Sequence, residues 1–201
     1  MTSDKSLNYS QPDSYHFSED SILLAKYVSR NIKICAHKVL DLGAGCGVVG
    51  IEYSKIAKNP PVEITFVEKQ EVFREHLDSN LKLLPEEIVS RVFLQDVKKL
   101  NASEFDLIIS NPPYYNPQKG RLSENEIQNN CRFTTMLSPY ELCSSIFQHL
   151  NPVGEAWVLV GNSKEQNHSI TEFIHPELEV QEFKEGVFSI LRFMKLDKKR
   201  R

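Results

Sequence analysis

Several features that mark particular protein classes are scarce in this sequence. Only four cysteines occur in 201 residues, and they form no Cys-x-x-Cys pair and have no histidine at metal-ligand spacing. This scarcity argues against a disulfide framework and against structural zinc, so we expect no bound metal. The N-terminal segment is polar, and no apolar run approaches the length needed to cross a bilayer. We therefore expect a cytoplasmic protein without a membrane anchor.

The chain also lacks a strong excess of charge of either sign. Its 24 basic and 27 acidic residues leave a formal net charge of -3, which gives no overall electrostatic signature of nucleic-acid binding. Any surface for nucleic acid must then be local. The hydrophobic content of 40% is sufficient for one core. We expect a monomer with an arm and leading helix over 1–36, a core domain over 37–196 and a basic tail over 197–201.

Short β-branched apolar runs alternate with longer amphipathic stretches from Val39 onward. This alternation predicts an α/β domain with a mostly parallel sheet and helices on both faces. A capped apolar stretch over 18–28 predicts a leading helix. A tight turn at Glu185-Gly186 predicts a hairpin whose last strand runs antiparallel. The predicted strands cover 38–42, 62–67, 91–94, 105–110, 155–160, 179–184 and 187–196.

The first predicted strand runs into a glycine-rich turn, and a helix begins near Val48. Glycine lets the backbone turn sharply and approach a ligand closely because it has no β-carbon. The spacing Gly45-x-Gly47-x-x-Gly50 also satisfies the dinucleotide fingerprint. However, Asp41 lies in the strand, and a carboxylate facing the ligand would repel a pyrophosphate but suit the ammonium of a methionine moiety. The pattern favours S-adenosylmethionine (SAM), held by Asp41, Gly43, Ala44, Gly45 and Gly47.

Acidic residues follow the next two predicted strands. Glu68 ends the second strand, where a carboxylate can accept hydrogen bonds from both hydroxyls of a ribose. Asp96 follows the third strand and could accept the exocyclic amine of the cofactor's adenine. We include their neighbours Lys69 and Val97 in the predicted cofactor site. All of these residues stand at carboxyl ends of strands, where open α/β sheets bind ligands.

The fourth predicted strand ends at Asn111-Pro112-Pro113-Tyr114. Pro112 keeps Asn111 out of the helical region. The side-chain oxygen of Asn111 and the main-chain oxygen of Pro112 can then accept the two hydrogens of an amine and stabilise the positive charge that develops on its nitrogen during methylation. Tyr114 can stack on a base. We predict that Asn111, Pro112, Pro113 and Tyr114 are catalytic, and that Asn111 also borders the cofactor.

Together these motifs resemble the class I SAM-dependent methyltransferases, and Asn-Pro-Pro-Tyr resembles the signature of their amino-methylating branch. Residues 11–28, the run 109–115 and the later Arg132-Phe133-Thr134-Thr135 are similar to the bacterial tRNA-Val adenine-N6 methyltransferases. The resemblance implies a Rossmann-like fold with a seven-stranded sheet, SAM as cofactor and methylation of an adenine beside the anticodon of a tRNA. The turn at Glu185-Gly186 is shorter than in many members of that family.

The same resemblance implies which residues meet the substrate and the rest of the cofactor. Asp20 would line the cofactor site, and basic groups after the catalytic motif would contact RNA phosphates. The implied substrate residues are Phe17, Tyr115, Lys119, Arg121 and Arg132. Other acceptors with the same amine chemistry are guanine in ribosomal RNA and a glutamine in a protein. A scaffold that binds SAM and RNA without catalysis is the alternative outside enzymes.

Overall fold

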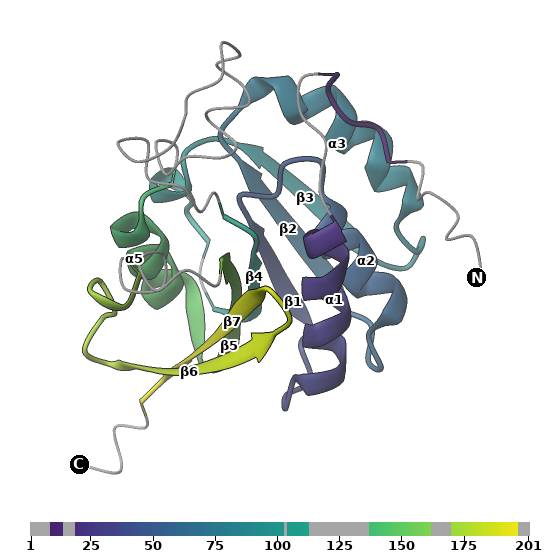
Figure 1. The fold of residues 1–201 in the computed structure, drawn as a ribbon. Helices are drawn as coiled ribbons and strands as arrows, with labels where there is room; N and C mark the ends of the chain where they lie inside the picture. The colour runs from purple at the N-terminus through teal and green to yellow at the C-terminus, as the bar shows by residue number, and fades with distance from the viewer. Residues whose placement is uncertain (1–8, 14–18, 103, 113–136, 162–169, 197–201) are drawn as a thin grey trace.

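The computed structural model describes residues 9–13, 19–102, 104–112, 137–161 and 170–196 (Figure 1). The α-helices are α1 (Glu19–Asn31), α2 (Val48–Ile56), α3 (Arg74–Asn80) and α5 (Pro139–His149). Short 3-10 helices are η1 (Glu71–Phe73), η2 (Leu81–Leu83) and η3 (Val97–Lys99). The strands are β1 (Lys38–Leu42), β2 (Glu63–Glu68), β3 (Val89–Leu94), β4 (Phe105–Ser110), β5 (Leu150–Gly161), β6 (Leu178–Glu185) and β7 (Phe188–Lys195).

The strands form one seven-stranded sheet in the order β3-β2-β1-β4-β5-β7-β6. All neighbours from β3 to β5 pair in parallel, whereas β7 pairs antiparallel with both β5 and β6. The predicted α/β fold with an antiparallel last strand is confirmed. Because β2 and β3 lie on one side of β1 and β4 lies on the other, the strand order reverses at β1. Open α/β sheets bind ligands at such a reversal point, beyond the carboxyl ends of the strands.

The strand boundaries agree with the prediction to within two residues, except in β5, which begins at Leu150 instead of Glu155. The register between β4 and β5 shifts in this added part. It contains Pro152 and Gly154, and a β-carbon on Gly154 would lie 2.8 Å from the main-chain oxygen of Asp106. Both residue types normally weaken the interior of a strand. The sequence therefore concealed the first part of β5.

The leading helix and the C-terminal hairpin are both present. α1 covers the predicted stretch and continues three residues beyond it, to Asn31. In the hairpin, Glu185 pairs with Phe188, so the loop is Gly186 and Val187, one residue later than predicted. Gly186 has φ 59°. Such a conformation at the first loop position gives a turn whose twist matches that of the two strands.

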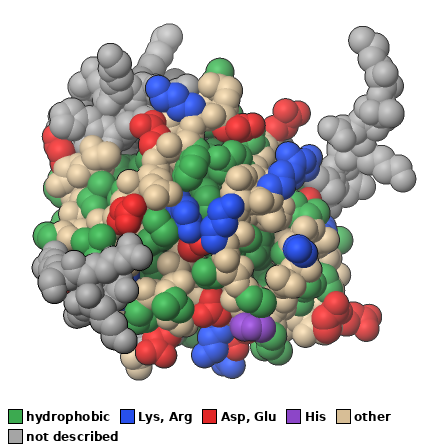
Figure 2. Space-filling view, turned by 90° about the horizontal axis from the view of Figure 1, so that it is seen from below, with side chains coloured by type: hydrophobic (Ala, Val, Ile, Leu, Met, Phe, Trp, Pro, Cys, Tyr) green, Lys and Arg blue, Asp and Glu red, His purple; other side chains and the backbone are tan. Residues whose placement is uncertain are grey.

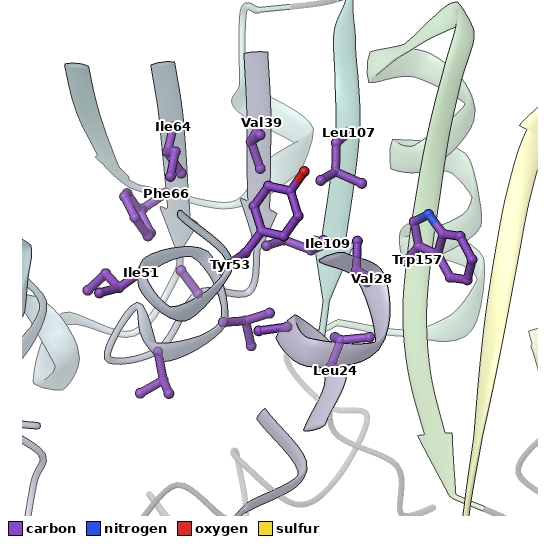
Figure 3. Close-up of a cluster of buried hydrophobic side chains, with 14 of the residues drawn as sticks. Leu24, Val28, Val39, Ile51, Tyr53, Ile64, Phe66, Leu107, Ile109 and Trp157 are labelled. Atoms are coloured by element: carbon purple, nitrogen blue, oxygen red, sulfur yellow. The ribbon is translucent and has the colours of Figure 1, made fainter. Parts of the chain in front are cut away.

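Helices cover both faces of the sheet, and each face has its own core (Figure 1). Consecutive strand residues point to opposite faces, so Val39 packs under α1 and α2 while Leu40 packs under α5. On the first face, shown in Figure 3, α1 and α2 contribute Leu24, Val28, Ile51 and Tyr53, and the strands contribute Val39, Ile64, Phe66, Leu107, Ile109 and Trp157. This packing holds α1 against the strands that carry the site described below.

A buried ion pair lies where β5 and β7 meet the end of α1. Glu155 is 1% exposed, and its Oε1 accepts hydrogen bonds from Arg192 Nη2 at 2.6 Å and from the main-chain N–H of Lys33 at 3.1 Å. Its Oε2 accepts from Trp157 Nε1 at 2.9 Å. The guanidinium of Arg192 also lies over the Trp157 ring, 5.5 Å from its centroid. The two charges thus depend on each other and on Trp157.

His149, at the end of α5, is buried and makes one hydrogen bond through its ring. Its Nδ1 lies 2.5 Å from the main-chain oxygen of Ala102, so Nδ1 carries the hydrogen, and Nε2 has no hydrogen-bond partner among the described residues. Burial lowers the pKa of His149 and the charge of Lys195 acts in the same direction, while the main-chain oxygens of Ala102 and Val97 act against both. The folded protein therefore favours the neutral form of this ring more than the unfolded chain does.

This neutral histidine predicts a loss of stability in acid. As the pH falls through the ordinary pKa of 6.5, the histidine of the unfolded chain binds a proton more readily than His149 in the folded chain does. Stability then falls as the pH drops below about 6.5, by at most about 1.4 kcal/mol per pH unit for one proton. Urea unfolding of wild type and of His149→Asn is measured at pH 8, 7, 6 and 5.5. The free energy of unfolding of wild type should approach that of the variant at the acid end, because asparagine binds no proton. A difference independent of pH would contradict the prediction.

One face of the described part is mixed in charge. Figure 2 views the molecule from the end at which α1 finishes, and Lys and Arg side chains there stand among Asp, Glu and hydrophobic side chains. This matches the small net charge of the sequence. Among the described helices, none has the length and apolar character needed to cross a membrane.

Candidate active site

The carboxyl ends of four parallel strands lie side by side in the order β3, β2, β1, β4. The residues that follow or end these strands are Asp96, Glu68, Gly43 and Asn111. Parallel strands bring their carboxyl ends to one edge of a sheet, so residues far apart in the sequence meet there (Figure 1). The predicted cofactor residues and the first catalytic residue therefore lie along a single edge.

The glycine turn is attached to the end of β2 and is open on one side. The N–H groups of Gly43 and Ala44 both donate to the last-but-one carbonyl of β2, at 2.9 and 3.0 Å. Gly43, Gly45 and Gly47 have φ values of 73°, 53° and 79°, which side chains disfavour. A β-carbon on Gly47 would lie 2.6 Å from Leu77 Cδ1, whereas one on Gly45 would meet no described atom within 4 Å. Gly47 is thus packed, and Gly45 faces space that a ligand can fill.

Glu68 holds the glycine turn from the end of β2. It is buried, and its Oε2 accepts from Gly45 N–H at 2.9 Å while its Oε1 accepts from the N–H groups of Lys69 and Gln70 at 2.8 and 2.7 Å. Burial raises the pKa of Glu68, and the three N–H groups act to lower it. A carboxylate oxygen accepts about two hydrogen bonds. Oε2 therefore keeps one site for a ligand hydroxyl, although we predicted that Glu68 binds both hydroxyls of a ribose.

Asp41 is buried, and one of its carboxylate oxygens binds the start of α2. It is 1% exposed, and its Oδ2 accepts from Gly50 N–H in the first turn of α2 at 2.8 Å. A β-carbon on Gly50 would lie 2.9 Å from this oxygen, so glycine permits the approach. The pKa of Asp41 is raised to about 7, because burial and the charge of Glu68 outweigh the Gly50 N–H, which acts to lower it. Asp41 satisfies a free N–H at the start of the helix, and its contact with a methionine ammonium stays a prediction.

Asp96 is the outermost acid of the edge. It accepts from the main-chain N–H of Lys98 at 3.0 Å, and its Oδ2 lies 3.1 Å from Lys69 Nζ. Burial acts to raise the pKa of Asp96, but the Lys98 N–H and the Lys69 ammonium outweigh it, and the pKa is lowered. The ionised carboxylate is an acceptor suited to an amine. Its neighbour Val97 is buried, and Lys98 also pairs with Glu141 of α5.

Asn111 stands directly beyond β4 and is held from two sides. Before it, Ser110 Oγ donates to the main-chain oxygen of Leu42 at 2.7 Å, which joins the ends of β4 and β1. Its own Nδ2 donates to Ser21 Oγ of α1 at 3.0 Å. Its Oδ1 is buried and has no hydrogen-bond partner among the described residues. A buried amide oxygen without a donor is costly, so this oxygen is placed to accept an N–H from a ligand.

Asn80 ties the N-terminal arm to the glycine turn, and the sequence did not reveal this role. Its Nδ2 donates to the main-chain oxygens of Cys46 and Ser10, at 2.9 and 2.8 Å, and its Oδ1 accepts from Ser10 N–H at 2.7 Å. These partners are 34 and 70 residues away in the chain. Asn80 is one of the residues that resemble the bacterial tRNA-Val adenine-N6 methyltransferases, but nothing in the sequence indicated which groups it contacts. The arm and the turn are therefore one assembly at this edge.

Of the remaining predicted residues, Asp20 and Pro112 are described, and seven lie outside the described part. Asp20 is buried in the first turn of α1, where its Oδ1 accepts from Ser21 N–H at 2.9 Å. The residues outside the described part are Phe17, Pro113, Tyr114, Tyr115, Lys119, Arg121 and Arg132. Pro112 is described and buried. Within the described ranges, no three His, Cys, Asp or Glu side chains come together as they would around a metal ion.

Comparison with known proteins assigns the chain to a family. Residues 16–192 match the family described as Methyltransferase small domain. A tRNA1(Val) (adenine(37)-N6)-methyltransferase from Serratia proteamaculans (strain 568) is 30% identical over 129 residues, which are 62% of this chain and 48% of the relative. The enzyme of the same name from Pseudoalteromonas translucida (strain TAC 125) is 30% identical over 145 residues, 71% and 58% of the two chains. The chain spans about half the length of these curated relatives.

Solved structures show the same fold. The ribosomal protein L11 methylase of Lactobacillus delbrueckii subsp. bulgaricus aligns with a TM-score of 0.65 and 14% identity, covering 90% of this chain and 81% of that one. TrmN from Thermus thermophilus aligns with a TM-score of 0.61 and 16% identity, covering 87% and 49%. The predicted Rossmann-like methyltransferase fold is confirmed, and the family implies SAM as methyl donor. The chain belongs to the Methyltransferase small domain family and has the Rossmann-like fold of class I methyltransferases.

Proposed function

We propose that this protein transfers the methyl group of SAM to the exocyclic amine (N6) of an adenine in tRNA, beside the anticodon. The observation that carries the proposal is the buried Oδ1 of Asn111 at the carboxyl end of β4, which has no hydrogen-bond partner among the described residues. An amine nitrogen attached to a base needs an acceptor for its hydrogens, because its lone pair is delocalised into the ring. The names of the relatives at 30% identity supply the choice of adenine and of tRNA.

The described residues fit the cofactor. The open side of Gly45 leaves space where the backbone turns, and a free acceptor site on Glu68 Oε2 lies beside it. The ionised carboxylate of Asp96 stands on the next strand outward. These residues would hold the methionine part, the ribose and the adenine of SAM in turn. When bound, SAM supplies a methyl group activated by a positively charged sulfur.

The chain's own contribution is to hold and polarise the acceptor amine. Asn111 Oδ1 accepts one amine hydrogen, and the main-chain oxygen of Pro112 is placed next to it in the chain to accept the other. Two acceptors fix the direction of the nitrogen lone pair and favour the positive charge that grows on it. Holding the two reactants in contact provides further acceleration. Unpaired bases in an anticodon loop reach such a site at a lower cost than paired ones.

Methyl transfer to RNA tests the proposal directly. Purified protein is incubated with SAM labelled in its methyl group and with total tRNA from a strain that lacks the gene. The expected result is label in one tRNA, which nuclease digestion and mass spectrometry assign to N6-methyladenosine at a single position. Ribosomal RNA fragments and cell protein serve as competing acceptors in parallel. Label only in guanine, only in protein, or in no acceptor would each overturn the proposal.

The role proposed for Glu68 predicts a defect in cofactor binding. Glu68→Gln replaces one acceptor oxygen with an NH2 group, which cannot accept from Gly45 N–H or from a ribose hydroxyl. Affinity for SAM should fall roughly tenfold, the effect of one such hydrogen bond, as measured by isothermal titration calorimetry. Glu71→Gln is the matched control, because Glu71 is exposed in η1. Equal dissociation constants for the two variants would argue against the assignment.

A further inference from the structure

The amide of Asn111 is held by a residue from the other end of the domain. Ser21 Oγ, in the first turn of α1, accepts a hydrogen bond from Asn111 Nδ2 at 3.0 Å. The two residues are separated by 90 positions in the sequence. Ser21 is 7% exposed. The contact is thus made inside the protein, where water competes little with it.

Ser21 itself is firmly placed. Its main-chain N–H donates to Asp20 Oδ1 at 2.9 Å. The helix that carries it buries Leu24, Ala25 and Val28 against the sheet, each with no exposed surface. Figure 3 shows Leu24 and Val28 reaching toward the strand residues Leu107 and Ile109, which lie in the same strand as the residue preceding Asn111. α1 therefore presents the Ser21 hydroxyl at a defined position relative to the end of β4.

We propose that Ser21 is a positioning residue for catalysis: its hydroxyl binds the Nδ2 of Asn111 and so holds Oδ1 toward the amine that is methylated. This inference rests on the proposed function, since it assumes that Asn111 accepts from the amine. It assigns to α1 a second purpose beyond packing. The start of α1 therefore contributes a residue to the acceptor site at the end of β4.

The physical reason lies in the freedom of an asparagine side chain. Rotation about its last bond is broad and roughly two-fold, and a half turn exchanges the oxygen with the NH2 group. In the exchanged orientation an NH2 group would face the NH2 group of the substrate, and no hydrogen bond would form. The Ser21 hydroxyl can donate as well as accept, so the contact holds the amide in place, and the substrate amine, which needs an acceptor, selects the orientation in which Oδ1 faces it. The Ser21 contact therefore restrains the amide before the substrate arrives, so that less of its rotational freedom is lost on binding.

Ser21→Ala tests the proposal, with Ser29→Ala as matched control. Ser29 lies in the same helix, but its hydroxyl is exposed and donates to the main-chain oxygen of Lys26. For Ser21→Ala we expect kcat for tRNA methylation to fall roughly tenfold, the value of one buried hydrogen bond. The dissociation constant for SAM should stay within about twofold of wild type, since no direct contact with the cofactor is lost. Ser29→Ala should change neither value.

Two further measurements separate positioning from general damage. In the Asn111→Ala background, adding Ser21→Ala should cost nothing more in kcat, because the amide that it positions is gone. In protein labelled with nitrogen-15 asparagine, the side-chain NH2 resonance of Asn111 is identified by its loss in Asn111→Ala. Ser21→Ala should shift that resonance and speed the exchange of its hydrogens with water.

The outcomes distinguish this proposal from the one on which it rests. A tenfold loss that persists in the Asn111→Ala background, or an Asn111 resonance unmoved by Ser21→Ala, overturns the role of Ser21 and leaves the proposed function intact. If wild type methylates no adenine in tRNA, the proposed function fails. The kinetic arms then use whichever acceptor the protein does label, and the resonance measurement, which needs no substrate, decides whether Ser21 holds the amide.

Discussion

Replacing Asn111 with alanine is expected to lower kcat for methyl transfer by roughly a hundredfold or more, with little change in the dissociation constant for SAM. The alanine removes the buried Oδ1 that accepts from the amine, and it leaves the glycine turn and Glu68 as they are. The loss therefore falls on the reacting nitrogen and not on the cofactor. Single-turnover assays with labelled SAM measure the rate, and calorimetry measures SAM binding.

Asn101→Ala is the matched control for this experiment. Asn101 is an exposed asparagine that precedes β4, whereas Asn111 follows the other end of that strand. Its replacement should leave both the rate and the affinity unchanged. If Asn111→Ala weakens SAM binding as much as it slows turnover, Asn111 supports the cofactor and not the acceptor amine. If Asn111→Ala kept full activity, Asn111 would have no role in methyl transfer.

Replacing Arg192 with methionine is expected to destabilise the fold by about 3–5 kcal/mol, the usual cost of removing one partner from a buried ion pair. Glu155 is 1% exposed and would keep its charge in the core without the guanidinium that lies 2.6 Å from its Oε1. Methionine preserves much of the arginine stem beside Trp157, so the effect comes mainly from the charge. Urea unfolding at pH 7 measures the free energy.

The exposed pair Arg91 and Glu63, on β3 and β2, provides a control within the same sheet. Their side chains are 3.0 Å apart and 58% and 21% exposed. An ion pair so open to water contributes about 0–1 kcal/mol, and Arg91→Met should cost no more than that. Equal losses in Arg192→Met and Arg91→Met would mean that Glu155 is relieved by water or by Lys33. The buried pair would then not be a main support of the β5–β7 junction.

The sequence alone determined the backbone of the site. The bounds of β1 and β4 were predicted to the residue, because short β-branched runs end at residues that forbid continuation. Glycine at 43, 45 and 47 indicated a sharp turn, and in the structure all three have positive φ angles, which few other residues accept. These signals are local, because they depend on residues close together in the chain. They determined the sheet edge at which Glu68 and Asn111 lie.

The tertiary structure decided which side chains meet there. The sequence offered no sign that Glu68 binds the amide of Gly45, that Asp41 turns toward Gly50, or that Asn80 joins the arm to the turn. It likewise concealed the start of β5 behind a proline and a glycine. Each of these depends on how closely two backbones approach, and that distance is set by the packing of the helices on the sheet.

The contact between Ser21 and Asn111 shows the division most clearly. The asparagine was conspicuous because prolines follow it, whereas the serine looked like any polar residue near the start of a helix. Only the folding of α1 onto the sheet brings its hydroxyl to 3.0 Å from the amide. Sequence determined the acceptor and the glycine turn because their backbone chemistry is local. Tertiary structure determined the orientation of the acceptor because hydrogen bonds between distant segments form only once the core has placed them.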